Sequence, residues 1–381
     1  MRWLGPVVYC IAFLDAFLLF TIVPLLPQYV EELDMSKTQA GIVVSVYSAV
    51  VLVAALPVGR LADRIGAKRL TLFGLVTLIV STALVGVASE FWMLFLARAG
   101  QGLSSAISWT AGLAWLAGVG EERRRAALLS TAIAAGSLGG LLGPITSGPL
   151  AEALGLHAPF LIYAGLAGLL TLAALVPPET HGGEHREVTL PELARLTARS
   201  PALAAAALVT TLVATVSGVV ETLVPLRMGE DGYSAVAISA VLGTAGLVSA
   251  VVVITVGRLY GRLDGFRVGI VAVIGMAVMT GLLTLPLAAL TVGLVYILGA
   301  PSIGAQYAIA FPLAADGADR ARLPPGAVLG VINVCWGLGY LVGPAVGSAI
   351  ADLSSDQVAY ALATLVSVAA VPRLRRLALA S

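Results

Sequence analysis

The chain has 381 residues, of which 59% are hydrophobic and only 11% are charged, and its mean hydropathy is +0.98. A soluble domain carries about a quarter charged residues, so lipid must cover much of this surface. The formal net charge of +1 leaves no basic face, which excludes a nucleic-acid partner. The two cysteines, Cys10 and Cys335, lie at opposite ends of the chain and suggest neither a disulfide framework nor a metal site.

Apolar runs long enough to cross a bilayer recur along the whole chain. A helical span needs about 20 apolar residues. Counting such runs predicts twelve spans: 6–29, 38–58, 70–88, 92–117, 127–150, 158–176, 202–226, 235–257, 268–286, 288–313, 327–350 and 358–372. The first run is too long for a signal-peptide core, so we expect a retained helix. The last run is short for a crossing.

The basic residues predict the orientation of the spans. With the N-terminus placed in the cytoplasm, 19 of the 22 lysines and arginines fall in inward-facing segments. Lys37 and Arg227 lie outside, and Arg98 lies within a span. The alternation holds only for an even number of spans, which predicts that both termini are cytoplasmic.

The two halves of the chain repeat each other. Three short motifs recur at offsets of 198, 200 and 201 residues, each at the corresponding span: Val58–Leu61 as Val256–Leu259, Gly143-Pro144 as Gly343-Pro344, and Val23–Leu25 as Val224–Leu226. Such a duplication is typical of transporters that rock two halves about a central site. The sequence therefore predicts an all-α membrane protein with two pseudo-symmetric six-helix bundles, at 1–176 and 201–381. The polar stretch 177–200 between them is predicted to be a cytoplasmic linker with a short amphipathic segment near 191–199.

The loop after the second span carries a specific motif. Between positions 59 and 69 it combines glycines, an acid and basic residues at fixed spacing: Gly59, Asp63, Arg64, Gly66, Lys68 and Arg69. Glycines permit a tight turn, and a carboxylate can accept hydrogen bonds from the amides at a helix N-terminus. This loop resembles the signature loop of the major facilitator superfamily, and the resemblance implies the major facilitator fold and a conformational latch. In the second half Gly261 stands where the first half has Asp63.

Spans four and five carry two further motifs. Arg98-Ala99-Gly100-Gln101-Gly102 looks like the Arg-x-x-Gln-Gly motif of the superfamily. A buried arginine needs a partner, and we expect a carboxylate that takes up and releases a proton; an arginine that snorkels to the surface is the alternative. In span five the small residues and the proline look like the glycine–proline motif of the antiporter branch, and we expect them to pack helices closely: Gly136, Gly139, Gly140, Gly143, Pro144 and Gly148.

Two acids lie deep in apolar spans, Asp15 in span one and Glu221 in span seven. Desolvation favours the protonated form of such a carboxyl group, whereas a nearby arginine or a cationic substrate favours the ionised form. A group balanced between these effects can exchange a proton for a cation. An acid that only orients helices is the alternative for each.

The neighbourhoods of both acids narrow the resemblance. Phe13–Leu19 with Val23–Pro27, and Glu221–Pro225, are similar to spans one and seven of vesicular amine transporters and bacterial drug–proton antiporters. In these carriers the two acids take part in amine recognition and proton coupling, which implies the same roles for Asp15 and Glu221. The resemblance extends over Asn333–Pro344, but the amine carriers have an acid at Asn333 and another in the tenth span. The candidate proton and substrate residues are thus Asp15, Glu221, Arg98 and Asn333.

Aromatic residues in the spans could receive a cation through cation–π contact. Four are candidates to line a cavity, with packing against neighbours or lipid as the alternative: Tyr47, Trp109, Tyr307 and Trp336.

The function expected is export of a cationic or amphiphilic small molecule by a proton-coupled antiporter. Protons are the expected coupling ion, no other cofactor is expected, and one chain suffices as a monomer. The expected location is a bacterial or archaeal inner membrane. A carrier of sugars, siderophores or organic anions is the alternative within the fold, and a transport-inactive sensor is the alternative of another class. An enzyme is not expected, because the sequence lacks a phosphate-binding glycine loop, a zinc-ligand cluster and a catalytic triad at one depth.

Overall fold

The computed structural model describes residues 3–118, 122–180, 200–320 and 325–380, with Arg195, Thr197 and Ala198 besides. Within these ranges nearly all of the chain is helical and none of it forms a strand, as predicted. Its contacts divide it into two compact units, Met1–His185 with Gly232–Gly243, and Arg186–Asp231 with Thr244–Ser381. The predicted limits of the bundles at 176 and 201 stay a prediction, and most of the predicted linker, including its amphipathic segment, lies outside the described residues.

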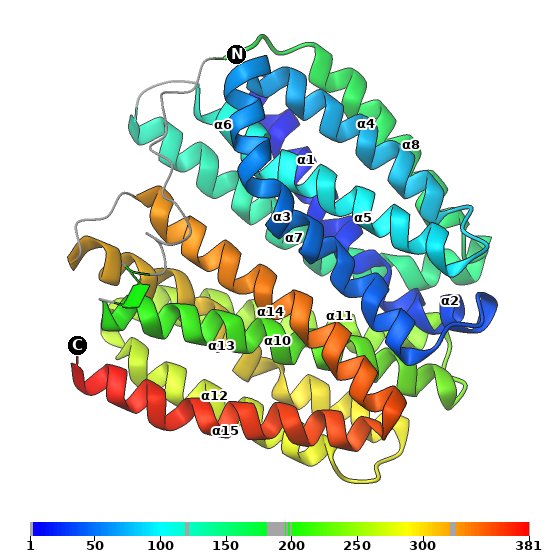
Figure 1. The fold of residues 1–381 in the computed structure, drawn as a ribbon, viewed down its shortest axis with the longest axis vertical. Coiled ribbons are helices and arrows are strands. Elements are labelled where there is room, and N and C mark those ends of the chain that lie inside the picture. The colour runs from blue at the N-terminus through cyan, green and yellow to red at the C-terminus, as the bar shows by residue number, and fades with distance from the viewer. Residues whose placement is uncertain are drawn as a thin grey trace. The chain divides into compact units, whose positions relative to one another are not determined.

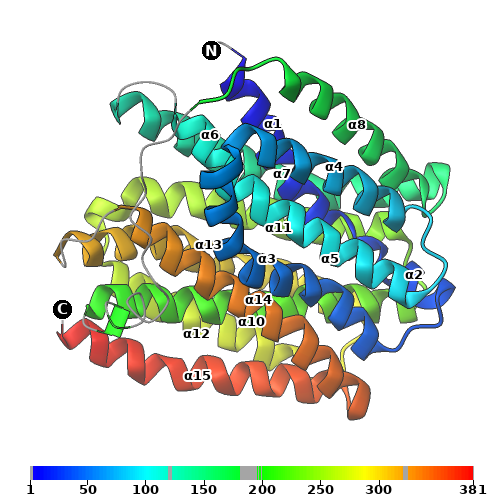
Figure 2. The ribbon, with the colours of Figure 1, turned by 45° about the horizontal axis from the view of Figure 1, so that its top comes forward.

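The first unit contains eight α-helices and two irregular helical turns: α1 (Leu4–Thr21), η1 (Val23–Leu25), α2 (Leu26–Glu32), α3 (Lys37–Ile65), α4 (Ala67–Val85), α5 (Phe91–Ile107), η2 (Ser108–Gly112), α6 (Leu113–Ala117), α7 (Glu122–Leu154) and α8 (Ala158–Leu175). Figure 1 shows α1 lying against α7, and Figure 2 shows α4 beside α5; both pairs are in contact.

The second unit contains five complete α-helices and most of a sixth, α11. The first residues of α11, up to Gly243, belong to the first unit. The helical elements are α10 (Pro201–Glu230), α11 (Ala235–Leu259), η3 (Tyr260–Arg262), α12 (Gly265–Leu283), α13 (Ala289–Arg320), α14 (Pro325–Leu353) and α15 (Asp356–Ala380). In this unit α10 contacts both α13 and α14, and α12 lies beside α15 in both views (Figures 1 and 2).

The twelve predicted spans all correspond to helical segments. Eleven helical stretches of the described chain are long and apolar enough to cross a membrane. The remaining prediction, 92–117, is the continuous run α5–η2–α6, which a π-helical turn divides into pieces that are each shorter than a span. The expectation of a short last span was wrong, because α15 continues past Pro372 to Ala380.

Span one is broken where the sequence has Val23-Pro24-Leu25. Pro24 has no N–H to donate to the preceding turn, and the chain forms the 3₁₀ turn η1 between α1 and α2. The repeat of this motif, Val224-Pro225-Leu226, lies inside the continuous helix α10. The same three residues therefore break the helix in one half only.

Glycines bring the helices of each unit into close contact. A Cβ atom on Gly139 of α7 would lie 2.0 Å from the carbonyl oxygen of Phe13, and one on Gly143 would lie 2.3 Å from that of Phe17. The second unit repeats this crossing, since a Cβ on Gly343 of α14 would lie 2.2 Å from the Thr215 carbonyl oxygen. No side chain fits at these positions, so α7 packs directly on the backbone of α1. Two other residues of the predicted packing motif lie beside the crossings: Gly140 faces the Phe20 ring, and Pro344 contacts Gly218.

Candidate functional site

Asp15 of α1 lies in a polar cluster inside the first unit. Its side chain is 2% exposed. Three donors converge on one carboxylate oxygen, Oδ2: the Trp109 indole N–H at 2.8 Å, the Ser105 hydroxyl at 2.9 Å and the Tyr47 hydroxyl at 3.2 Å. The other oxygen, Oδ1, is buried and accepts no hydrogen bond from the described residues. Tyr47 and Trp109, two predicted cavity aromatics, thus serve as hydrogen-bond donors to the acid.

Arg98 of α5 lies beside this cluster and is 1% exposed, so it does not snorkel to the surface. Its guanidinium donates to the Gln101 side-chain oxygen at 2.7 Å, and to the carbonyl oxygens of Leu19 at 3.2 Å and Leu18 at 3.4 Å. These carbonyls belong to the last turn of α1, where the break at η1 interrupts the helical hydrogen bonds.

The charge of Arg98 also reaches the acid. The guanidinium lies 5.1 Å from the centre of the Tyr47 ring, whose hydroxyl donates to Asp15. It is close enough to Asp15 to interact with it electrostatically. Arg98 therefore lies near Asp15, with Tyr47 between them, but does not bond to it directly. The guanidinium instead bonds to carbonyl oxygens at the broken end of span one.

A π-helical turn completes the first cluster. The turn η2 begins at Ser108, so Trp109 lies on it, one residue beyond its start. A π-turn rotates the side chains that follow it relative to an α-helix, and such turns occur frequently at functional sites. Here it separates Ser105, on the regular helix, from Trp109, on the turn, and both reach the same oxygen atom of Asp15.

Glu221 of α10 has a different environment, inside the second unit. It is half-buried, and its Oε2 accepts a hydrogen bond from the Tyr340 hydroxyl at 3.0 Å. The Tyr340 ring stacks on Trp336 with their centroids 5.1 Å apart. Tyr307 and Tyr296 of α13 lie close enough to interact with the carboxylate electrostatically. Among the described residues, this acid therefore has one hydrogen-bond donor and aromatic neighbours, whereas Asp15 has three donors.

Asn333 takes no part in these contacts. It lies on α14, seven residues before Tyr340, and is exposed. Seven residues are about two helical turns, so Asn333 and Tyr340 share one face of α14. The predicted site residues thus form two clusters: one contains Asp15, Arg98, Tyr47 and Trp109, and the other contains Glu221, Tyr307 and Trp336. No hydrogen bond among the described residues connects Asn333 to either acid.

The sequence analysis missed Ser105 and Tyr340, the neutral partners of the two acids. A signal was present for the first: Arg98, Gln101 and Ser105 are spaced by three and four residues and so lie on one helix face. Among the residues that the structure describes, no three His, Cys, Asp or Glu side chains gather closely enough to hold a metal ion.

The signature loop turns on a single residue. Gly59, Asp63 and Arg64 lie within α3, which ends at Ile65, and α4 begins at Ala67. Gly66 between them has φ +95°, a left-handed conformation that favours glycine. Asp63, Arg64 and Arg69 are exposed.

Glu179, which the sequence analysis did not identify, caps α4 in place of Asp63. Its Oε1 accepts a hydrogen bond from the Lys68 backbone N–H at 2.8 Å, at the positive end of the helix. The Lys68 ammonium group donates to the carbonyl oxygens of Leu175 and Pro177, and the Trp115 indole donates to that of Pro178 at 2.9 Å. The end of α8 and the segment that follows it are thus bound to the start of α4, through Lys68, and to α6, through Trp115.

Replacing Glu179 by alanine is expected to lower the stability of the protein by about 1 kcal/mol, because a partly exposed hydrogen bond to a charged group is lost. The midpoint of thermal unfolding in detergent is expected to fall by roughly 2 °C. Glu152→Ala, at an exposed position near the end of α7, is the control. Equal shifts in the two variants would show that Glu179 contributes nothing as a cap.

Comparison with known proteins agrees with these features. The sequence model of the Major Facilitator Superfamily matches residues 8–324. The probable vesicular acetylcholine transporter-B of Danio rerio is 32% identical over 203 residues, which are 50% of this chain and 41% of that protein. The class C tetracycline resistance protein of Escherichia coli is 30% identical over 181 residues, 46% of this chain and 45% of that protein. The matched part thus spans less than half the length of each relative.

A solved structure shows the same fold. The crystal structure of a bacterial homologue of the human lysosomal transporter Spinster, inward-facing and occupied, aligns with a TM-score of 0.78 at 15% identity and covers 99% of this chain and 95% of that one. The family match covers most of the chain and includes both the signature loop and the two buried acids. This chain belongs to the major facilitator superfamily of membrane transporters.

Proposed function

We propose that this transporter is a proton-coupled antiporter that exports cationic or amphiphilic small molecules. The observation that carries the proposal is the Asp15 cluster: a carboxyl group, 2% exposed in a membrane-spanning helix, with three donors on one oxygen. Because Oδ2 is used as an acceptor three times, the acid proton belongs on Oδ1. The site can therefore hold or release a proton without rearranging the donors.

Glu221 is the second acid of the proposal. A carboxylate beside tyrosine and tryptophan faces suits an organic cation, which gains from both the charge and the rings. In the proposed cycle, protons from outside neutralise Asp15 or Glu221 and release the cation outward. Deprotonation toward the cytoplasm then restores the negative charge for the next cation. The names of the two relatives, an acetylcholine transporter and a tetracycline resistance protein, support cargo of this class.

An organic anion is a weaker candidate for the cargo. It would need a cationic side chain in the spans, and Arg98 is the one that the sequence places there. Its guanidinium already donates to Gln101, Leu18 and Leu19. The bonds to Leu18 and Leu19 hold the end of α1, so an anion at Arg98 would compete with them.

The proposal includes the setting of the transporter. The positive-inside pattern supports a topology with both termini in the cytoplasm, and the proposed location is the inner membrane of a bacterial or archaeal cell. Protons are the proposed coupling ion, and one chain with its own pathway is sufficient for transport.

The test is cation-driven proton movement in proteoliposomes that hold a pH-sensitive dye. Adding tetraphenylphosphonium to wild-type vesicles is expected to move protons, and Glu221→Gln is expected to reduce the rate at least about tenfold. Glu152→Gln, exposed in the first unit, is the matched control. Passage of a neutral or anionic solute with no proton movement for any organic cation would contradict the proposal.

A further inference from the structure

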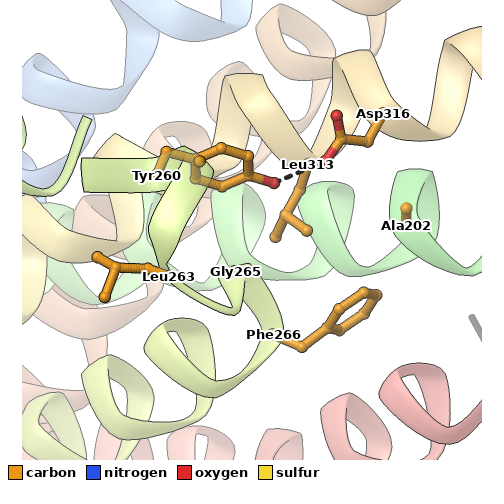
Figure 3. A pocket seen from close by; sticks show the side chains of 8 residues that line it. Ala202, Tyr260, Leu263, Gly265, Phe266, Leu313 and Asp316 are labelled. Atoms are coloured by element: carbon orange, nitrogen blue, oxygen red, sulfur yellow. Dashed lines mark hydrogen bonds between the residues drawn. The ribbon is translucent and has the colours of Figure 1, made fainter. Parts of the chain in front are cut away.

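A cavity of about 500 Å³ lies in the second unit. It opens between the start of α10, the turn η3, the start of α12 and the end of α13, and its main lining side chains are Ala202, Tyr260, Leu263, Phe266, Leu313 and Asp316 (Figure 3). Ala202 and Glu221 are 19 residues apart on α10, which separates them by roughly 28 Å along the helix. The cavity is therefore not part of the Glu221 cluster. The arginines nearby predict that it faces the cytoplasm.

The cavity combines a carboxylate with aromatic and apolar walls. The Tyr260 hydroxyl donates to Oδ2 of Asp316 at 2.9 Å, and Figure 3 shows the hydroxyl directed at the carboxylate with Leu313 beside it. Asp316 is exposed, whereas Leu313 and Ala202 are buried and form an apolar floor. A volume in this range is typical of small-molecule sites.

Among the side chains that the structure describes, Asp264 has more hydrogen-bond and ionic partners than Asp316. Asp264 caps α12, since its Oδ1 accepts from the backbone N–H groups of Phe266 at 3.0 Å and Arg267 at 3.2 Å. Its Oδ2 also lies 3.1 Å from Nε of Arg267. The bond from Tyr260, by contrast, brings a neutral phenol to Asp316. Arg262 follows the lining residue Gly261 in sequence but does not itself line the cavity.

In the first unit, the position that corresponds to this cavity is occupied by a segment of the chain. Gly66 at the start of α4 corresponds to Gly265 at the start of α12, 199 residues later. In the first unit the segment after α8 crosses this place, and Glu179 caps α4. In the second unit Asp264 already caps α12, and α15 continues as a helix to Ala380 where the first half has left its helix. The same place is therefore open in the second unit, and it carries an acid.

We propose that this cavity is a second site for amphiphilic organic cations, on the cytoplasmic side. Asp316 supplies the negative charge, the rings of Phe266 and Tyr260 supply faces for cation–π contact, and Leu313 receives the apolar part of the molecule. The site captures cargo before it reaches Glu221. The choice of cargo rests on the proposed function, but binding at the cavity does not require proton coupling.

The test uses thiol protection by tetraphenylphosphonium. Leu263→Cys is introduced in a Cys10→Ser, Cys335→Ser background, and the rate of maleimide labelling is measured in proteoliposomes with and without the cation. We expect tetraphenylphosphonium to slow labelling at least about threefold, in the presence of Glu221→Gln as well, and neutral triphenylphosphine oxide to have no effect. Adding Asp316→Asn is expected to abolish the protection. Labelling of Val87→Cys, exposed in the first unit, is the positional control and is expected to stay unchanged.

A direct measurement supplements the labelling. Glu221→Gln protein is expected to keep a weaker class of tetraphenylphosphonium binding, which Glu221→Gln with Asp316→Asn loses. No protection in a protein that still moves protons with the cation would overturn the second site and leave the proposed antiport intact. Protection that disappears with Glu221→Gln alone would also overturn it, because the signal would then come from the central acid. Protection without any proton movement would support the cavity and refute antiport.

Discussion

Asp15→Asn is expected to abolish proton-driven transport, with a loss of at least about 100-fold in the accumulation of tetraphenylphosphonium by inside-out vesicles whose lumen is acidic. Asparagine has nearly the shape of aspartate, but its side-chain amide cannot take up or release a proton at the pH values of the experiment. The Trp109, Ser105 and Tyr47 donors can still pair with the amide oxygen, so the local structure is expected to persist. The measurement is uptake of the labelled cation into inside-out vesicles with an imposed pH difference.

Exchange without a gradient separates coupling from folding in this experiment. Asp15→Asn protein is expected to exchange labelled for unlabelled tetraphenylphosphonium across vesicles at equal pH, because this reaction needs alternation but no net proton transfer. Gradient-driven accumulation at the wild-type rate in Asp15→Asn would show that the proton is carried elsewhere. Loss of both reactions together with a lower thermal midpoint would show that Asp15 is structural.

The second large effect is expected from the smallest of substitutions, Gly139→Ala. Alanine normally stabilises a helix relative to glycine. At this position the added Cβ would lie 2.0 Å from the Phe13 carbonyl oxygen, and a backbone atom cannot turn aside as a flexible side chain can. The helices α1 and α7 must separate, at an expected cost of about 3 kcal/mol. The midpoint of thermal unfolding is expected to fall by roughly 5–10 °C.

The first unit offers a matched control. Gly165, in α8, has no heavy atom within 4 Å of the position that a Cβ would take. Gly165→Ala is therefore expected to leave the midpoint unchanged or to raise it slightly. Gly343→Ala, at the repeated crossing in the second unit, is expected to behave like Gly139→Ala, because its Cβ would lie 2.2 Å from the Thr215 carbonyl oxygen. A similar midpoint for Gly139→Ala and Gly165→Ala would contradict the close crossing.

The sequence by itself determined the class of the molecule, its membrane spans and the charged residues within those spans, whose burial in lipid is energetically unfavourable. A bilayer requires about 20 apolar residues in each helix, so the spans are visible as runs of composition. It also disfavours charge so strongly that Asp15, Arg98 and Glu221 stood out without any structure. The two repeats were visible because motifs recurred at a nearly constant offset. These signals all depend on local composition or on spacing along the chain.

The tertiary structure decided which groups meet. Ser105 and Tyr340 are neutral, and neutral polar residues are too common in spans for their type to indicate which acid they serve. Two partners of Arg98 are the backbone carbonyls of Leu18 and Leu19, beside the break at η1, and the same motif at Pro225 leaves its helix intact. Whether a carbonyl is open depends on the hydrogen bonds around it, which no residue type encodes.

Residue types and local spacing also did not predict the packing of the helices or the contacts of the loops. The sequence placed Gly139 in a predicted packing motif but did not indicate its partner, and only the structure shows that α1 leaves no room for a side chain there. Glu179 lies 111 residues from the amide that it caps, so the spacing of the signature loop could not indicate it and suggested Asp63 instead. The cavity at Asp316 is open because α15 stays helical where the first repeat leaves its helix. Contacts between distant segments depend on the whole packing of the chain, and they decided every feature that local composition left open.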